Sequence, residues 1–79
     1  MENLFSKNLK VLRENRKLSQ NKLAKMIGVN QTTVARWEDD EMTPRLDMVL
    51  KLAEIFDVDL ATLAGRKIVV QDGLISVEN

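Results

Sequence analysis

The sequence contains no cysteine and no histidine. The first absence excludes disulfides, thiolate metal ligands and a cysteine nucleophile, and the second removes the side chain that most often serves as general base or metal ligand. No apolar run approaches the roughly 18 residues of a membrane span, and the first residues lack the apolar stretch of a secretory signal. We therefore expect a soluble, cytoplasmic protein without a metal site, a cofactor or catalytic residues.

A chain of 79 residues is expected to form one small domain. Its formal net charge is zero, but the charges are unevenly distributed along the sequence. Residues 1–36 carry eight Lys or Arg and two Glu, whereas residues 37–79 carry four Lys or Arg and ten Asp or Glu. A basic half is typical of a face that binds nucleic acid. The alternative is a solvated first helix with ordinary surface lysines.

Residues 19–27 are predicted to form a short helix that ends in a tight turn. Ser19 is a suitable N-cap, and Gly28 occupies the position after the helix where a left-handed conformation favours glycine. Ala24 is small enough to let a following helix approach to about 8–10 Å between axes. The apolar residues at helical spacing are Leu23, Met26 and Ile27.

Residues 30–39 are predicted to form the second helix of the pair. Asn30 is placed to cap this helix, and Val34 and Trp37 are expected to face inward. Its other positions lack the Glu and Lys that usually fill a surface helix; they are Gln31, Thr32, Thr33, Ala35 and Arg36. Consecutive threonines have low helix propensity, so helix stability does not explain them. A base-reading surface would explain them, whereas the alternative is plain packing of two amphipathic helices.

The pattern resembles the lambda-repressor/Cro family of helix-turn-helix DNA-binding domains, the XRE type. The matching residues are Leu12-Arg13, Ser19-Gln20, Leu23-Ala24, Gly28-Val29, Val34, Trp37-Glu38 and Pro44. The resemblance covers about residues 7–64, and the number of fixed offsets makes it specific. It implies an all-α, five-helix lambda-repressor-like DNA-binding domain over residues 1–65. The expected helices span about residues 4–16, 19–27, 30–39, 44–56 and 59–64.

The resemblance also implies roles for individual residues. The base-reading residues would be Gln31, Thr32, Thr33 and Arg36, on a helix lying in the major groove of double-stranded DNA. Contacts to DNA phosphates are expected from Gln20, Asn30, Lys22 and Arg45. The structural frame of the motif would be Ala24, Gly28, Val34 and Trp37. Arg13 is expected to pair with Glu38, and the alternative is two exposed charges without contact.

Other buried and capping positions follow from apolar spacing and end signals. The first helix is expected to bury Leu4, Phe5, Leu9 and Leu12. The fourth is expected to bury Leu46, Val49, Leu50, Ala53, Ile55 and Phe56. Asp59 should cap the fifth helix, and Gly65 should end it. One departure from the family is Asp40, which replaces a common glycine within an acidic run, so we expect this loop to be held off the DNA.

Residues 66–79 depart from the helical pattern. Two β-branched runs, 67–71 and 74–77, flank Asp72-Gly73, which is a hairpin turn signal. An isolated two-stranded hairpin is marginal in water, so its apolar residues need a partner surface. We interpret the segment as a dimerisation hairpin, and the alternative is a hairpin folded only onto its own helices. The proposed dimerisation residues are Ile68, Val70, Leu74, Ile75 and Val77.

These features predict a sequence-specific DNA-binding transcriptional regulator. We expect a phage- or prophage-type repressor, bacterial or phage-encoded, that binds a palindromic operator as a homodimer. The alternative is an antitoxin or other protein-interaction module, whose acidic half and apolar tail would face a protein partner and which could also regulate its own operon. An enzyme is the third hypothesis, and it is disfavoured because the chain has no glycine-rich phosphate loop and no histidine or cysteine.

Overall fold

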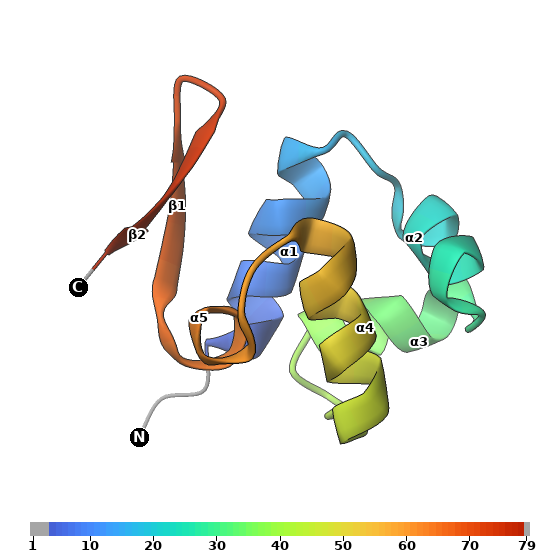
Figure 1. The fold of residues 1–79 in the computed structure, drawn as a ribbon. Helices are drawn as coiled ribbons and strands as arrows, with labels where there is room; N and C mark the ends of the chain where they lie inside the picture. The colour runs from blue at the N-terminus through green and yellow to red at the C-terminus, as the bar shows by residue number, and fades with distance from the viewer. Residues whose placement is uncertain (1–3, 79) are drawn as a thin grey trace.

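The computed structural model describes residues 4–78, which form five helices followed by a β-hairpin (Figure 1). The elements are α1 (Phe5–Asn15), α2 (Gln20–Ile27), α3 (Gln31–Glu38), α4 (Leu46–Phe56), α5 (Leu60–Gly65), β1 (Lys67–Gln71) and β2 (Leu74–Glu78). The predicted five-helix fold with a C-terminal hairpin is confirmed, and every helix begins and ends within two residues of its expected bounds. Residues 1–3, at the start of the predicted domain 1–65, and residue 79, at the end of the predicted hairpin segment 66–79, lie outside the described residues.

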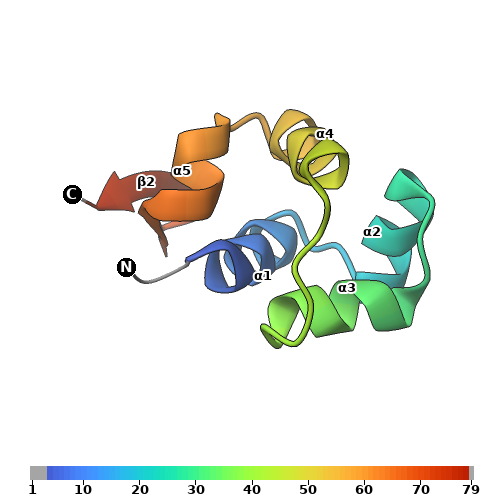
Figure 2. The ribbon, with the colours of Figure 1, turned by 90° about the horizontal axis from the view of Figure 1, so that it is seen from below.

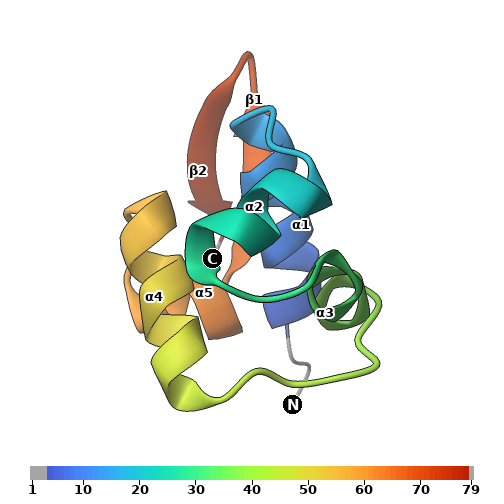
Figure 3. The same ribbon diagram turned by 90° about the vertical axis from the view of Figure 1, so that its right-hand side faces the viewer.

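The helix pair α2–α3 and the hairpin lie at opposite ends of the molecule, with α1 between them (Figures 1 and 2). Helix α1 packs against α3 on one side and against α5 and β1 on the other. Seen from the α2 end, α3 lies to one side of α2 and α4 to the other (Figure 3). None of the described helices is long and apolar enough to cross a membrane.

A single apolar cluster lies among the helices and reaches the first strand. Its buried members are Phe5, Leu9, Leu12, Leu23, Ala24, Ile27, Val34, Trp37, Leu52, Ala53, Phe56, Leu63 and Ile68. The predicted stripe of α1 is present, although Leu4 at its start is only half-buried. Every helix therefore contributes to one core, and α1 is its central element.

The predicted inner face of α4 is partly wrong. Leu46 and Leu50 are 64% and 48% exposed, whereas Leu52, which was not predicted, is fully buried beside Phe56. Apolar residues surround most of this helix, so their spacing does not select one face, and packing against α2 and α5 decides it. Met26 on α2 was also predicted to face inward and is half exposed.

The predicted helix starts are correct at two of three caps. The Ser19 side chain accepts the Lys22 backbone N–H at 2.9 Å, and the Asp59 carboxylate accepts a backbone N–H at the start of α5 at 2.7 Å. Asn30 has the extended backbone of an N-cap, but its side chain makes no capping hydrogen bond. The N–H of Thr33 donates instead to the Asn30 backbone carbonyl at 3.0 Å.

The hairpin forms with the predicted turn. Asp72 and Gly73 both have positive φ, 54° and 79°, as a two-residue mirror-image turn requires. The strands pair antiparallel with Gln71 opposite Leu74 and Ile68 opposite Val77. Ile68 is only 3% exposed because it belongs to the core of its own chain. It was proposed as a dimerisation residue, and in this structure its side chain packs inside its own chain instead.

A buried asparagine joins the hairpin to the helices. Asn8 on α1 donates from its side-chain nitrogen to the backbone carbonyls of Leu63 at 2.9 Å and Arg66 at 2.6 Å, and its side-chain oxygen accepts the Ile68 N–H at 3.2 Å. These bonds give hydrogen-bond partners to the backbone groups in and just after the last turn of α5. Gly65 is the last residue of α5, as expected, and Arg66 continues the chain in extended backbone.

We expect Asn8→Ala to lower the free energy of unfolding by about 2–4 kcal/mol, because it leaves buried carbonyls and a buried N–H without partners. Urea denaturation followed by circular dichroism measures this loss. Lys10→Ala, on the exposed side of the same helix, is the control and should change stability by less than about 0.5 kcal/mol. Equal effects of the two substitutions would contradict the structural role of Asn8.

Candidate nucleic-acid interface

The turn between α2 and α3 is fixed by backbone geometry. Gly28 adopts the left-handed conformation with φ of 79°, and the N–H groups of Gly28 and Val29 both donate to the carbonyl of Ala24, at 2.9 and 3.0 Å. Ala24 on α2 is buried where the two helices meet, and Val34 and Trp37 on the facing side of α3 are buried too. The four predicted frame residues thus lie inside or at the turn of the helix pair, where they set the position of α3.

The opposite side of α3 is open to solvent. Gln31, Thr32 and Arg36 are exposed, and Thr33 is half-buried beside them. The structure therefore brings the four predicted base-reading residues together on one helix that packs on α1 and α2 with its other face. An exposed helix of this kind fits the major groove of B-form DNA, which is about 12 Å wide.

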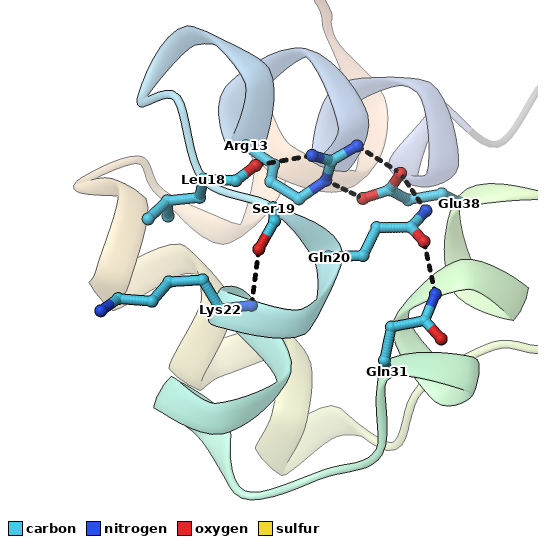
Figure 4. A network of polar contacts seen from close by, with 7 residues as sticks. All are labelled: Arg13, Leu18, Ser19, Gln20, Lys22, Gln31 and Glu38. Carbon is cyan, nitrogen blue, oxygen red and sulfur yellow. Dashed lines mark hydrogen bonds and ion pairs between the residues drawn. The ribbon is translucent and has the colours of Figure 1, made fainter.

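A nearly buried ion pair ties α1 to the end of α3. The Arg13 Nε atom lies 2.7 Å from Glu38 Oε2, and Arg13 Nη2 lies 3.1 Å from Glu38 Oε1 (Figure 4). The remaining Arg13 nitrogen, Nη1, donates to the Leu18 carbonyl at 2.6 Å. The hydrogen bond to Glu38 raises the pKa of Arg13, against the opposing effect of burial. The expected two-point contact is present, so the alternative of two separate exposed charges is excluded.

This ion pair continues into a chain of side-chain amides. Gln20 Nε2 donates to Glu38 Oε1 at 3.1 Å, and Gln31 Nε2 donates to Gln20 Oε1 at 2.7 Å (Figure 4). A carboxylate only accepts hydrogen bonds, so Gln20 must turn its NH₂ group toward Glu38 and its oxygen toward Gln31. Gln31 must then donate to that oxygen, which leaves one N–H and its carbonyl oxygen for a ligand.

The sequence did not predict this amide chain, although it singled out each of its members. Arg13 and Glu38 were paired through the family pattern, and Gln20 and Gln31 were each assigned a separate contact with DNA. Nothing in the spacing indicates that Gln20 lies between them, because the contact depends on how α2 crosses α3. A glutamine at the first turn of both helices is the signal that could have suggested it.

The predicted phosphate-binding residues share a position at helix N-termini. Gln20 and Lys22 lie in the first turn of α2, Asn30 at the N-cap of α3 and Arg45 at the N-cap of α4. Free backbone N–H groups and the helix dipole make such ends favourable for anions. The Arg45 side chain is exposed and lies 3.2 Å from Asp47, in a surface ion pair of the kind that contributes little energy.

The acidic loop after α3 is attached to α1. Asp40 takes the left-handed conformation with φ of 59°, where the family has glycine, and Ser6 Oγ donates to its carboxylate at 3.3 Å. The neighbouring Asp39 and Glu41 are exposed. Within residues 4–78 there is no cluster of three or more acidic side chains that could hold a metal ion. The loop thus places negative charge beside the C-terminal end of α3.

A family model described as helix-turn-helix, HTH_3, matches residues 9–63. A putative HTH-type transcriptional regulatory protein of Methanosarcina acetivorans is 40% identical over 53 residues, which is 67% of this chain and 16% of that protein. The transcriptional repressor RstR of the cryptic phage CTXphi from Vibrio cholerae is 37% identical over 62 residues, 78% of this chain and 56% of that protein. The chain thus spans about one sixth of the archaeal relative and about half of the repressor.

Solved structures share the fold. A transcriptional regulator from Listeria innocua superposes with a TM-score of 0.79 at 25% identity, covering 91% of this chain and 67% of that chain. The P22 c2 repressor, in complex with a synthetic operator, superposes with a TM-score of 0.73 at 24% identity, covering 77% of this chain and 92% of that chain. Hydroxypropylphosphonic acid epoxidase from S. wedmorenis superposes with a TM-score of 0.70 at 28% identity, covering 89% of this chain and 38% of that chain. An enzyme therefore also contains this fold.

We expect Arg13→Met to lower the free energy of unfolding by about 3–5 kcal/mol, because it leaves the buried Glu38 carboxylate without its partner. Fluorescence of Trp37, the single tryptophan and a buried one, reports the unfolding transition in urea. The double variant Arg13→Met with Glu38→Met is the control, and it should recover most of the loss since no buried charge remains. Single and double variants of equal stability would contradict the pairing.

Proposed function

The chain belongs to the HTH_3 helix-turn-helix family, the XRE or Cro/C1 type with a lambda-repressor-like fold, and from this premise we propose that it is a sequence-specific transcriptional regulator that reads the major groove of DNA with α3. One observation carries the proposal: the open face of α3 presents Gln31 in an orientation that Glu38 fixes through Gln20. A packing helix would have no need for a solvent-exposed amide held in one orientation.

The free groups of Gln31 match one base. Its carboxamide offers an acceptor oxygen and a second N–H donor, and adenine presents an amine donor beside the N7 acceptor in the major groove. Arg36, about one turn after Thr32 on the exposed side of the same helix, can donate two hydrogen bonds to guanine, and a Thr32 or Thr33 methyl group can contact a thymine methyl. Each two-point contact contributes about 1–3 kcal/mol of discrimination. We propose that Gln31 and Arg36 determine most of the sequence preference.

Phosphate contacts would supply orientation and much of the affinity. We assign them to Gln20, Lys22, Asn30 and Arg45, which lie at helix N-termini. Gln20 keeps one side-chain N–H and its place in the first turn of α2 after its bonds to Glu38 and Gln31. The acidic loop around Asp40 would be repelled by the DNA backbone, so it would favour approaches that place the α2–α3 end on the duplex.

We further propose that the regulator is a repressor of the phage or prophage type that acts as a homodimer in the cytoplasm. The repressor names of the Vibrio and P22 relatives support the class, and the weak binding expected of one small module at physiological salt supports two copies on a palindromic operator. Half-sites one helical turn apart would be separated by about 34 Å. We propose binding and not catalysis, since the amide chain and the open helix face suit recognition.

Selection of binding duplexes from a random DNA pool at about 0.15 M salt, a concentration at which phosphate contacts alone bind weakly, tests this function. We expect an enriched inverted repeat, with adenine and guanine at the positions that Gln31 and Arg36 reach. Bulk binding that weakens with salt and enriches no sequence would contradict the proposal. It would instead direct the search to a protein partner.

We expect Arg36→Ala to weaken operator binding by about 10- to 100-fold and to remove the preference at one base pair, because its contact is to a base edge. Selection repeated with the variant measures the preference, and fluorescence anisotropy measures the affinity. Lys22→Ala is the matched control, and it should weaken binding to all sequences equally and reduce the salt dependence. Uniform weakening by Arg36→Ala would make it a phosphate contact and contradict the assignment.

A further inference from the structure

Strand β2 is an unprotected sheet edge. All five of its residues are exposed, and among the described elements it packs extensively against β1 alone. Natural sheet edges are usually protected by lysine, proline, a bulge or a covering element. The sequence Leu74–Glu78 contains no lysine or proline, and its pairing with β1 runs without a bulge. A strand with these properties is a template for pairing with another strand.

The two-residue turn determines which backbone groups of β2 are free. Gln71 and Leu74 close the turn, so their backbone groups face each other. Because successive pairs in an antiparallel ladder alternate, Ser76 also turns its backbone groups toward β1. Ile75 and Val77 therefore direct their N–H and C=O groups outward. The free edge therefore offers one N–H donor and one C=O acceptor at Ile75, and the same two groups again at Val77.

We infer that the partner of this edge is β2 of a second copy of the chain, antiparallel to the first, with Ser76 opposite the partner subunit's Ser76. In this register Ile75 lies opposite the partner subunit's Val77, so the outward backbone groups of the two strands meet. Ser76 is the midpoint of the strand, and centring on it uses all five residues of each copy. The inference rests on the proposed function, for which it identifies the surface that makes the regulator a dimer.

Side chains support the same register. Residues directly opposite one another lie on the same sheet face, and Val70 pairs with Ile75 as Ile68 pairs with Val77. A second β2 would extend these pairs into two rows of four β-branched side chains across four strands. Val70, Ile75 and Val77 are 42%, 37% and 39% exposed in one copy, and Ile68 already packs into the core. The rows would continue the apolar face that β1 presents to α1.

The size of the contact indicates a weak dimer. Two five-residue strands bury much less than the about 1,200 Å² of a standard stable interface. Binding of two copies to adjacent half-sites would raise their effective concentration and complete the pairing on DNA. Association without DNA should therefore be measured at chain concentrations up to about 0.5 mM, where a weak dimer is populated.

Sedimentation equilibrium of the full chain without DNA tests the inference. Ser76→Lys and Ser76→Glu each place like charges opposite each other at the two-fold axis, and each should weaken association about two- to fivefold. A 1:1 mixture of the two variants should restore association, because Lys then faces Glu. Gln71→Lys, on the same sheet face but on β1, is the matched control and should associate like the unaltered chain. A monomeric unaltered chain, undiminished association of Ser76→Lys, or an unrestored mixture would overturn the inference.

A cysteine cross-link gives a second, independent readout. The chain has no cysteine, and directly opposed residues whose backbone groups do not bond each other have Cα atoms about 4.5 Å apart, within reach of a disulfide. Oxidised Ser76→Cys should form a covalent dimer, whereas Gln71→Cys should not, and equal cross-linking would overturn the register. Neither experiment contains DNA, so a dimer with this interface that selects no sequence would refute the proposed function alone. A chain that selects an operator without this interface would refute the inference alone.

Discussion

The buried pair between Arg13 and Glu38 is the interaction on which the rest of the interface depends. It holds the C-terminal end of α3 against α1, and its carboxylate fixes the orientation of Gln20 and, through it, of Gln31. Burying two charges has a large desolvation cost, so an apolar pair could be as stabilising. A carboxylate at this position does what an apolar side chain could not, because it determines which way an exposed amide must point.

Local signals in the sequence predicted the helix ends well. Ser19, Gly28 and the Asp72-Gly73 turn act through their own backbone and nearest neighbours, so their effects can be read without knowing the fold. The frame of the motif was predictable for a different reason, since its fixed offsets resemble a family. The buried face of α4 was not, because Leu46 and Leu52 are chemically alike and only the arrangement of the other helices selects between them.

Most long-range polar contacts could not be predicted; the Arg13–Glu38 pair was expected, through the family pattern. Asn8 bonds to residues more than 50 positions away, and Gln20 reaches α3 only because the two helices cross at a particular angle. Such contacts have no local pattern in the sequence. They connect the two ends of the molecule to α1: the amide chain joins α2 and α3 to the Arg13–Glu38 pair at one end, and Asn8 holds the hairpin at the other. The sequence therefore predicted the helix pair and its exposed face, whereas the orientation of Gln31 on that face required the structure.

Mapping the DNA contact by NMR tests the central claim most directly, namely that the α3 face with its oriented Gln31 is the recognition surface. Backbone and side-chain amide shifts of the labelled chain would be followed as a selected duplex is added. The account predicts the largest changes in the side-chain amides of Gln20 and Gln31 and in the backbone of α2 and α3 around them. Changes concentrated in the acidic loop after α3 or in the hairpin, with both glutamine amides unmoved, would contradict it.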